Sequence, residues 1–194
     1  MYRTVEQHIS RLQSFFDPSA NVFLNAGTPN QPFRSALEQL GGGETLFDGT
    51  VVDRDMALCC VSGLWLWNNY LDRSHTISQS IDTISGSFWH GIMHRREGDY
   101  GNAKYWFRHV GQHPVFSELA QQSRQLAQTH PLSDHLLPPC RDGQWDPYVF
   151  VDLCEQANRT RRPTEGDAAL RPWCQATQSA EWWILFDYCY QHAT

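Results

Sequence analysis

The sequence has no long apolar segment. No run of apolar residues approaches the roughly 20 residues that a helix needs to cross a bilayer. The N-terminal stretch MYRTVEQHISRLQ also lacks the apolar core of a secretory signal peptide. These two absences predict a protein that is not embedded in a membrane and that stays in the cytoplasm.

Basic residues are in the minority. The chain has 15 Lys and Arg against 21 Asp and Glu, which gives a formal net charge of −6 at pH 7. A net negative charge opposes the phosphate neutralisation that drives nonspecific binding to nucleic acids. The composition therefore predicts that nucleic acid is not a partner, and it leaves a small molecule or another protein.

Several motifs with a fixed spacing are also absent. The six cysteines include no Cys-x-x-Cys pair and no zinc-finger spacing, which favours buried thiols over a cysteine-based metal site. The glycine run at residues 41–43 is not followed by the Lys and Ser or Thr of a phosphate-binding loop. No segment alternates apolar and polar residues for long enough to predict a substantial sheet.

Aromatic residues and helical periodicity are abundant instead. Aromatic residues make up 13% of the 194 residues and include eight Trp, so the chain can bury one sizeable core. We predict an all-α fold, a single compact domain over residues 1–194 with about six or seven helices and a long irregular N-terminal segment. The polar stretch at residues 72–85 is expected to connect two helices. Helical patterns lie at residues 4–16, 33–40, 53–71, 87–97, 100–110, 115–128, 148–159 and 168–192.

Five of the nine histidines cluster in the middle of the chain. They are His75, His90, His94, His109 and His113. On a helical wheel, His90, His94 and Glu97 share a face that is separate from the apolar face. Histidines four residues apart on a helix can bind one divalent ion, and Glu97 can add a carboxylate ligand or act as a base. With His75 or Asp72 as a third ligand, the pattern predicts a site for a divalent metal such as zinc.

The spacing alone leaves other interpretations open. The metalloprotease form of His-x-x-x-His has Glu directly after the first His, and Gly91 stands in that place here. One alternative is a helix interface at which both rings hydrogen-bond to Asp72, Glu97 or Asp99. Another is a metal-free polar pocket that binds an organic ligand.

Polar residues beside the histidines are candidates for ligand binding. They are Arg96, Asn102, Lys104 and Tyr105. Arg96 falls near the middle of the apolar face of its helix, so its charge must be paired or reach solvent. We expect an ion pair with Asp72, Asp82 or Asp99. The alternative is a guanidinium that grips a carboxylate or phosphate group of a ligand.

The string WHGIMHRREGDYGNAKYWFRHVGQHP, within residues 87–114, resembles one tetratricopeptide-type helical hairpin. The matching positions are Gly91, the turn Gly98-Asp99-Tyr100, Ala103, Phe107 and Pro114. The resemblance implies two antiparallel helices that approach closely at Gly91 and Ala103. His90 and His94 stand where that motif has Leu and Tyr, and no second copy is present, so no peptide-binding solenoid is implied. The part HRREGDYGNAKYWFR also resembles a signature of a family of small uncharacterised proteins, from which no function carries over.

Two functions from different classes fit these features. The first is a polar pocket that binds a divalent metal or a small organic ligand. A hydrolase or lyase reaction in it would use His90, His94 and Glu97 as catalytic residues. The second is a noncatalytic interaction domain that presents the hairpin to a protein partner. The concentration of ionisable residues in one stretch favours the pocket, because a protein-binding surface does not require it.

Overall fold

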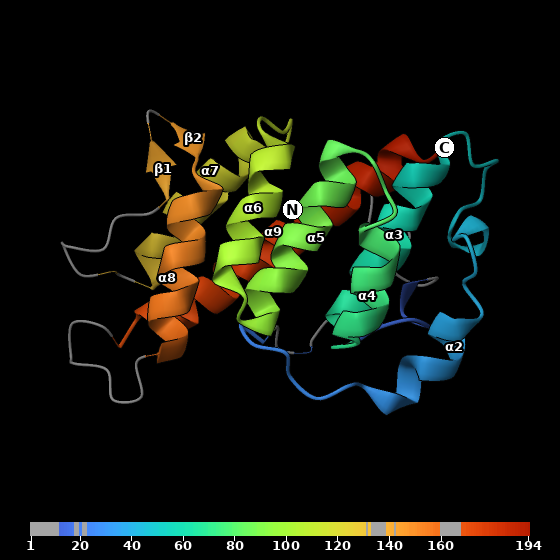
Figure 1. Ribbon diagram of the computed structural model, residues 1–194, viewed down its shortest axis with the longest axis horizontal. Helices are drawn as coiled ribbons and strands as arrows, with labels where there is room; N and C mark the ends of the chain where they lie inside the picture. Colours follow the sequence, from blue (N-terminus) through green and yellow to red (C-terminus); the bar gives the residue numbers. More distant parts are fainter. Residues whose placement is uncertain are drawn as a thin grey trace.

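The computed structural model describes residues 12–17, 20, 23–130, 132, 139–141, 143–159 and 168–194. This part of the chain contains eight α-helices, two short 3₁₀ helices and a two-stranded antiparallel hairpin, which confirms the predicted all-α fold (Figure 1). The α-helices are α2 (Arg34–Glu38), α3 (Arg54–Trp67), α4 (Leu71–Ser78), α5 (Ile84–Glu97), α6 (Tyr100–Val110), α7 (Phe116–Thr129), α8 (Pro147–Arg159) and α9 (Leu170–His192). The remaining elements are η1 (Gln31–Phe33), η2 (Glu44–Leu46), β1 (Cys140–Arg141) and β2 (Gln144–Trp145).

Helix α9 is the longest of these helices and lies behind the others across most of the molecule (Figure 1). It packs against α3, α7 and α8. The α5 and α6 helices lie side by side in front of it, and α4 packs against both α3 and α5. None of the helices in the described ranges combines the length and apolarity needed to cross a bilayer.

Most predicted helix positions agree with the structure to within three residues. The largest differences lie at the N-terminal side and at the connection after α3. The pattern at residues 4–16 lies mostly outside the described residues, although Leu12 and Phe16 are buried in the core. The long N-terminal segment holds only α2, η1 and η2 among its described residues, as its Gly, Pro and Asn content predicts.

Helix α3 ends earlier than predicted. Asp53 caps its start by accepting a hydrogen bond from the backbone N–H of Met56 at 3.0 Å. The helix stops at Trp67 and does not continue to Leu71. Asn69 adopts a left-handed conformation with φ 63°, which Asn tolerates better than most residues, and this turns the chain into α4.

The prediction of a polar connector at residues 72–85 is wrong for its first half, which forms α4. Its buried face consists of serines, so the apolar periodicity that signals a helix is missing. Ser74 and Ser78 are fully buried, and the Ser74 hydroxyl lies 2.9 Å from the Ser62 hydroxyl of α3. Small hydroxyl side chains therefore join α4 to α3 and set the distance between the two helices.

Local signals determine both ends of α5 and the start of α6. Thr83 caps α5 by accepting from the N–H of Gly86 at 3.0 Å, so the helix begins three residues before the predicted start. Gly98 ends it with φ 91°, and Asp99 then caps α6. The helices approach closely at Gly91, where an added Cβ would lie 3.0 Å from the Phe107 ring. These contacts describe a tight hairpin, and its likeness to a tetratricopeptide repeat stays a prediction.

A buried ion pair joins α5 to α9. The side chains of Arg95 and Glu181 are both fully buried, and the guanidinium donates to both carboxylate oxygens. Arg95 also donates to the side-chain oxygen of Gln178 at 3.2 Å and lies 4.5 Å from the centre of the Phe150 ring. No local sequence pattern predicts this pair, because its partners are 86 residues apart.

Candidate metal centre

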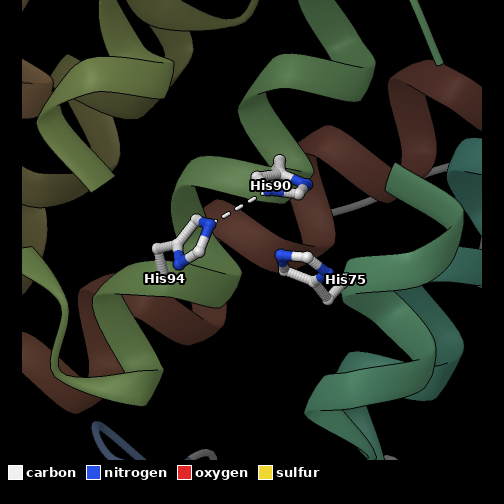
Figure 2. A group of neighbouring side chains, drawn as sticks. All are labelled: His75, His90 and His94. Carbon is white, nitrogen blue, oxygen red and sulfur yellow. Dashed lines mark hydrogen bonds between the residues drawn. The ribbon is translucent and has the colours of Figure 1, made fainter. Parts of the chain in front are cut away.

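Two helices bring three of the predicted histidines together. His90 and His94 lie one turn apart on α5, and His75 reaches toward them from α4 (Figure 2). One ring nitrogen of each histidine lies within 4.8 Å of the other two. The Nε2 atoms of His90 and His94 are 3.0 Å apart. The predicted convergence of these three residues is thus confirmed, whereas Asp72, the other candidate third ligand, is exposed and lies outside this group.

The cluster is mostly enclosed by protein. His90 and His94 are 1% and 5% exposed, and His75 is partly exposed. The ring of Trp106 from α6 lies over His90, with 4.1 Å between the ring centres. The ring centre of His75 lies 4.6 Å from that of His90 on another side. Solvent therefore reaches the group mainly from the side of His75.

A serine hydroxyl orients the His90 ring. Ser78 Oγ lies 2.8 Å from His90 Nδ1 and also donates its one hydrogen to the carbonyl oxygen of Ser74 at 2.8 Å. The tautomer of His90 sets the direction of the bond to Ser78: an Nδ1–H donates to the hydroxyl oxygen and leaves a lone pair on Nε2, whereas the hydrogen bond between His90 Nε2 and His94 Nε2 needs a proton on one of these two atoms. A metal ion at Nε2 requires the first tautomer and would take the place of that proton.

A carboxylate orients the His94 ring in the same way. Glu97 Oε2 accepts a hydrogen bond from His94 Nδ1 at 3.1 Å, which leaves a lone pair on Nε2. Asn102 from α6 donates to this Nε2 atom at 3.1 Å. Oxygen acceptors that hold one imidazole nitrogen and present the other are the usual second shell of histidine metal sites.

Burial keeps two of the rings neutral. Desolvation, followed by the charges of His94 and His75, lowers the pKa of His90 to about 3. Burial also lowers the pKa of His94, although its hydrogen bond to Glu97 opposes this shift. Both imidazoles are uncharged at neutral pH, and the uncharged imidazole is the form that binds a metal ion.

The other residues predicted to bind a ligand do not lie together in the structure. Asn102 lies at the histidine cluster through its bond to His94. Lys104 instead forms an ion pair with Asp152 on α8, and Tyr105 is 48% exposed. The sequence pattern did not single out Ser78. Ser78 lies three residues after His75, so a helix predicted at α4 would have placed both on one face.

The expected ion pair of Arg96 is wrong. Its guanidinium, 2% exposed, donates to the backbone oxygens of Leu66 and Asn25 and to the side-chain oxygen of Asn69. No carboxylate in the described ranges pairs with it. The expected partners were Asp72, Asp82 and Asp99. Arg96 points instead at the C-terminal end of α3, where carbonyl oxygens lack helical partners and carry partial negative charge.

The two remaining histidines of the sequence cluster lie apart from the triad. His109 is exposed beside Tyr105. His113 is 4% exposed, accepts from the N–H of Val115 at 3.3 Å through Nδ1, and lies 3.0 Å from the Ser85 hydroxyl through Nε2. Burial, with a smaller effect of His192, lowers the pKa of His113 to about 4.

His113 is therefore expected to make the fold sensitive to acid. Above about pH 6.5 the ring is neutral in both the folded and the unfolded chain, and its effect on stability is constant. As the pH falls from about 6.5 to about 4, only the unfolded chain takes up the proton, which costs about 3 kcal/mol of stability in total. Urea unfolding at a series of pH values measures this effect. Between about pH 6.5 and about pH 4, the free energy of unfolding should fall less for His113→Gln than for the parent protein.

The matched control for this prediction is His109→Gln, because it makes the same substitution at an exposed histidine four residues earlier, on α6. It should keep the pH dependence of the parent. Equal slopes for His113→Gln and the parent would contradict the assignment of the acid sensitivity to His113.

The group at α4 and α5 thus offers three imidazoles, of which His90 is held by a hydroxyl and His94 by a carboxylate and an amide. This donor set suits a borderline divalent ion such as zinc. Comparisons of the chain with protein-family models, with curated proteins and with solved structures found no match. The chemistry of the site is therefore inferred from its own geometry.

Proposed function

We propose that the protein binds one divalent transition-metal ion, preferably Zn²⁺, through His75, His90 and His94. The observation that carries this proposal is the convergence of three ring nitrogens within 4.8 Å of one another. Zinc binds imidazole nitrogen at about 2.0 to 2.1 Å, so the nitrogens of a tetrahedral site lie about 3.3 Å apart. Side-chain adjustments of about 1.5 Å or less therefore suffice to bring the three nitrogens to a zinc ion.

The hydrogen bonds behind the rings support the same interpretation. Ser78 and Glu97 each hold an Nδ1 atom from outside, so both Nε2 atoms of α5 face the position of the ion, which would replace their contact with each other and the hydrogen bond from Asn102. Glu97 then serves to position His94, since its carboxylate is already used by that ring. The first role expected of the ion is to link α4 to α5.

Three protein ligands leave a fourth position for water. A zinc-bound water loses its proton near neutral pH and becomes a nucleophile. Hydrolysis is therefore the reaction that we propose for this site if it is catalytic. The burial of His90 and His94 and the ring of Trp106 restrict that position to small molecules that approach beside His75. This enclosure favours metal binding as the primary function over turnover of a large substrate.

The alternative of a protein-interaction domain has less support. Among the described residues, the large apolar side chains that are exposed are Phe23, Val52, Ile84, Tyr105 and Val149. Of these, Ile84 and Tyr105 belong to the α5 and α6 hairpin, and they lie apart, at the first residue of α5 and in the middle of α6. They do not amount to the contiguous apolar surface that a partner would bury.

The proposal is tested by calorimetric titration of metal-stripped, untagged protein with Zn²⁺. We expect one equivalent of zinc to bind, and we expect His90→Ala to weaken binding by about 100-fold or more, because two ligands replace three and even second-shell changes cost 10- to 100-fold. His109→Ala is the matched control, since it removes an exposed histidine from the neighbouring helix. Circular dichroism confirms that each variant is folded.

The substitution Ser78→Ala tests the orienting hydrogen bond separately. It keeps all three imidazoles and should weaken zinc binding about tenfold. A parent protein that takes up no zinc would contradict the proposal. So would equal zinc affinities for the parent and His90→Ala, because the ion would then bind elsewhere.

A further inference from the structure

A polar cavity lies next to the candidate metal centre, on the other side of Glu97. It has a volume of about 600 Å³ and is formed where the end of α5 and the start of α6 face the end of α8 and the start of α9. Its polar walls come from Arg96, Glu97, Tyr100, Asn158 and Arg171. This volume is in the range of sites for small organic molecules.

The cavity contains a buried cation that has no anionic partner within the described ranges. Arg96 donates three hydrogen bonds, all to uncharged oxygens, and a guanidinium has five N–H donors. Burial, followed by the charge of Arg95, lowers the pKa of Arg96 to about 9, so the group stays charged at neutral pH. A buried charge that lacks a counterion is costly, and an anion in the cavity would offset that cost.

A second guanidinium lines the same cavity. Arg171, from the first turn of α9, donates one hydrogen bond to the backbone oxygen of Ala157 at 2.6 Å and is only partly buried. Among the described residues of the wall, the single carboxylate is that of Glu97, and its Oε2 atom is already bonded to His94. In this part of the wall two positive charges therefore face one negative charge.

We infer that this cavity binds a small oxyanion, the phosphate or carboxylate group of a metabolite-sized molecule, between Arg96 and Arg171. Guanidinium groups recognise such groups by paired, charge-assisted hydrogen bonds. The amide of Asn158 and the hydroxyl of Tyr100, which lie 3.0 Å apart, add polar groups at the wall. The inference does not depend on the metal proposal, since the two sites share no ligand. Glu97 borders both, so a bound oxyanion would lie close to the metal centre.

The test uses calorimetric titration at low ionic strength with two probes, inorganic phosphate and citrate. We expect saturable binding of at least one probe, and the stronger one identifies whether phosphate or carboxylate is preferred. Arg171→Gln should weaken that binding about tenfold or more, because it removes one of two charged donors. Arg124→Gln is the matched control, since it makes the same charge change at an exposed position on α7 and should leave binding unchanged.

A second measurement covers the case in which Arg171→Gln does not fold. In ¹⁵N-labelled parent protein, the Nε–H signal of Arg96, assigned by its loss in Arg96→Lys, should shift in a saturable way with the bound probe. The inference is overturned if neither probe saturates, or if Arg124→Gln weakens binding as much as Arg171→Gln. His90→Ala should lose zinc but keep the oxyanion, and Arg171→Gln the reverse, so the failure of one proposal is distinguishable from the failure of the other.

Discussion

Replacing Glu181 with alanine is expected to lower the free energy of unfolding by about 3 to 5 kcal/mol. The change leaves the Arg95 guanidinium fully buried, with Gln178 as its one remaining hydrogen-bond acceptor in the described structure. An uncompensated charge in the interior is far more costly than the loss of the pair's own attraction, because the charge cannot regain water without opening the interface between α5 and α9. Urea unfolding followed by tryptophan fluorescence measures the change.

Two further variants separate charge from packing. The double substitution Arg95→Met with Glu181→Leu removes both charges and keeps similar volume, so it should recover most of the lost stability. Asp152→Ala breaks the partly exposed pair with Lys104 and should cost no more than about 1 kcal/mol. A Glu181→Ala protein that is destabilised no more than Asp152→Ala would show that the buried pair has no special role.

The substitution Trp182→Ala is expected to destabilise the fold by about 3 to 5 kcal/mol. Trp182 is 2% exposed, stacks on Phe186 with 4.7 Å between ring centres, and meets Trp67 at 4.6 Å. Its indole N–H donates to the backbone oxygen of Gly63 at 2.8 Å. Alanine would leave a cavity where α3 meets α9, and the rigid neighbouring rings limit how far the core can collapse into it.

Chemical denaturation of two companion variants shows which part of the side chain matters. Trp182→Phe keeps an aromatic ring but removes the hydrogen bond from the indole N–H to the Gly63 oxygen, so we expect a smaller loss of about 1 to 3 kcal/mol. Trp183→Ala, at the partly exposed neighbour, should also cost less than Trp182→Ala. Equal losses for Trp182→Ala and Trp183→Ala would contradict the view that burial at the α3 and α9 contact sets the magnitude.

The hairpin of α5 and α6 shows how far local signals reach. Gly98 and Asp99 mark the end of one helix and the start of the next, and α6 has the predicted bounds. Such caps act within a few residues, so they can be interpreted without knowing the rest of the fold. Helix α4 had no comparable signal, because Ser74 and Ser78 occupy its buried face and serine is common on exposed surfaces.

The candidate site was predictable only as far as signals between neighbouring residues reach. The common helical face of His90 and His94 follows from their spacing of four residues alone. The choice of His75 over Asp72 as their companion follows from the packing of α4 on α3 and α5. The partners of Arg96 could not be predicted in this way. The helical wheel places Arg96 on the apolar face of α5, but its hydrogen-bond acceptors lie in segments that are distant along the chain.

The all-helical class, most helix ends and the pair of histidines on α5 are encoded in short stretches of residues, because periodicity, caps and glycines act over one or two turns. The third histidine, the ion pair between Arg95 and Glu181 and the cavity at Arg171 exist only once the helices have packed. Packing depends on the shapes of many side chains at once, and those contacts join residues far apart along the chain.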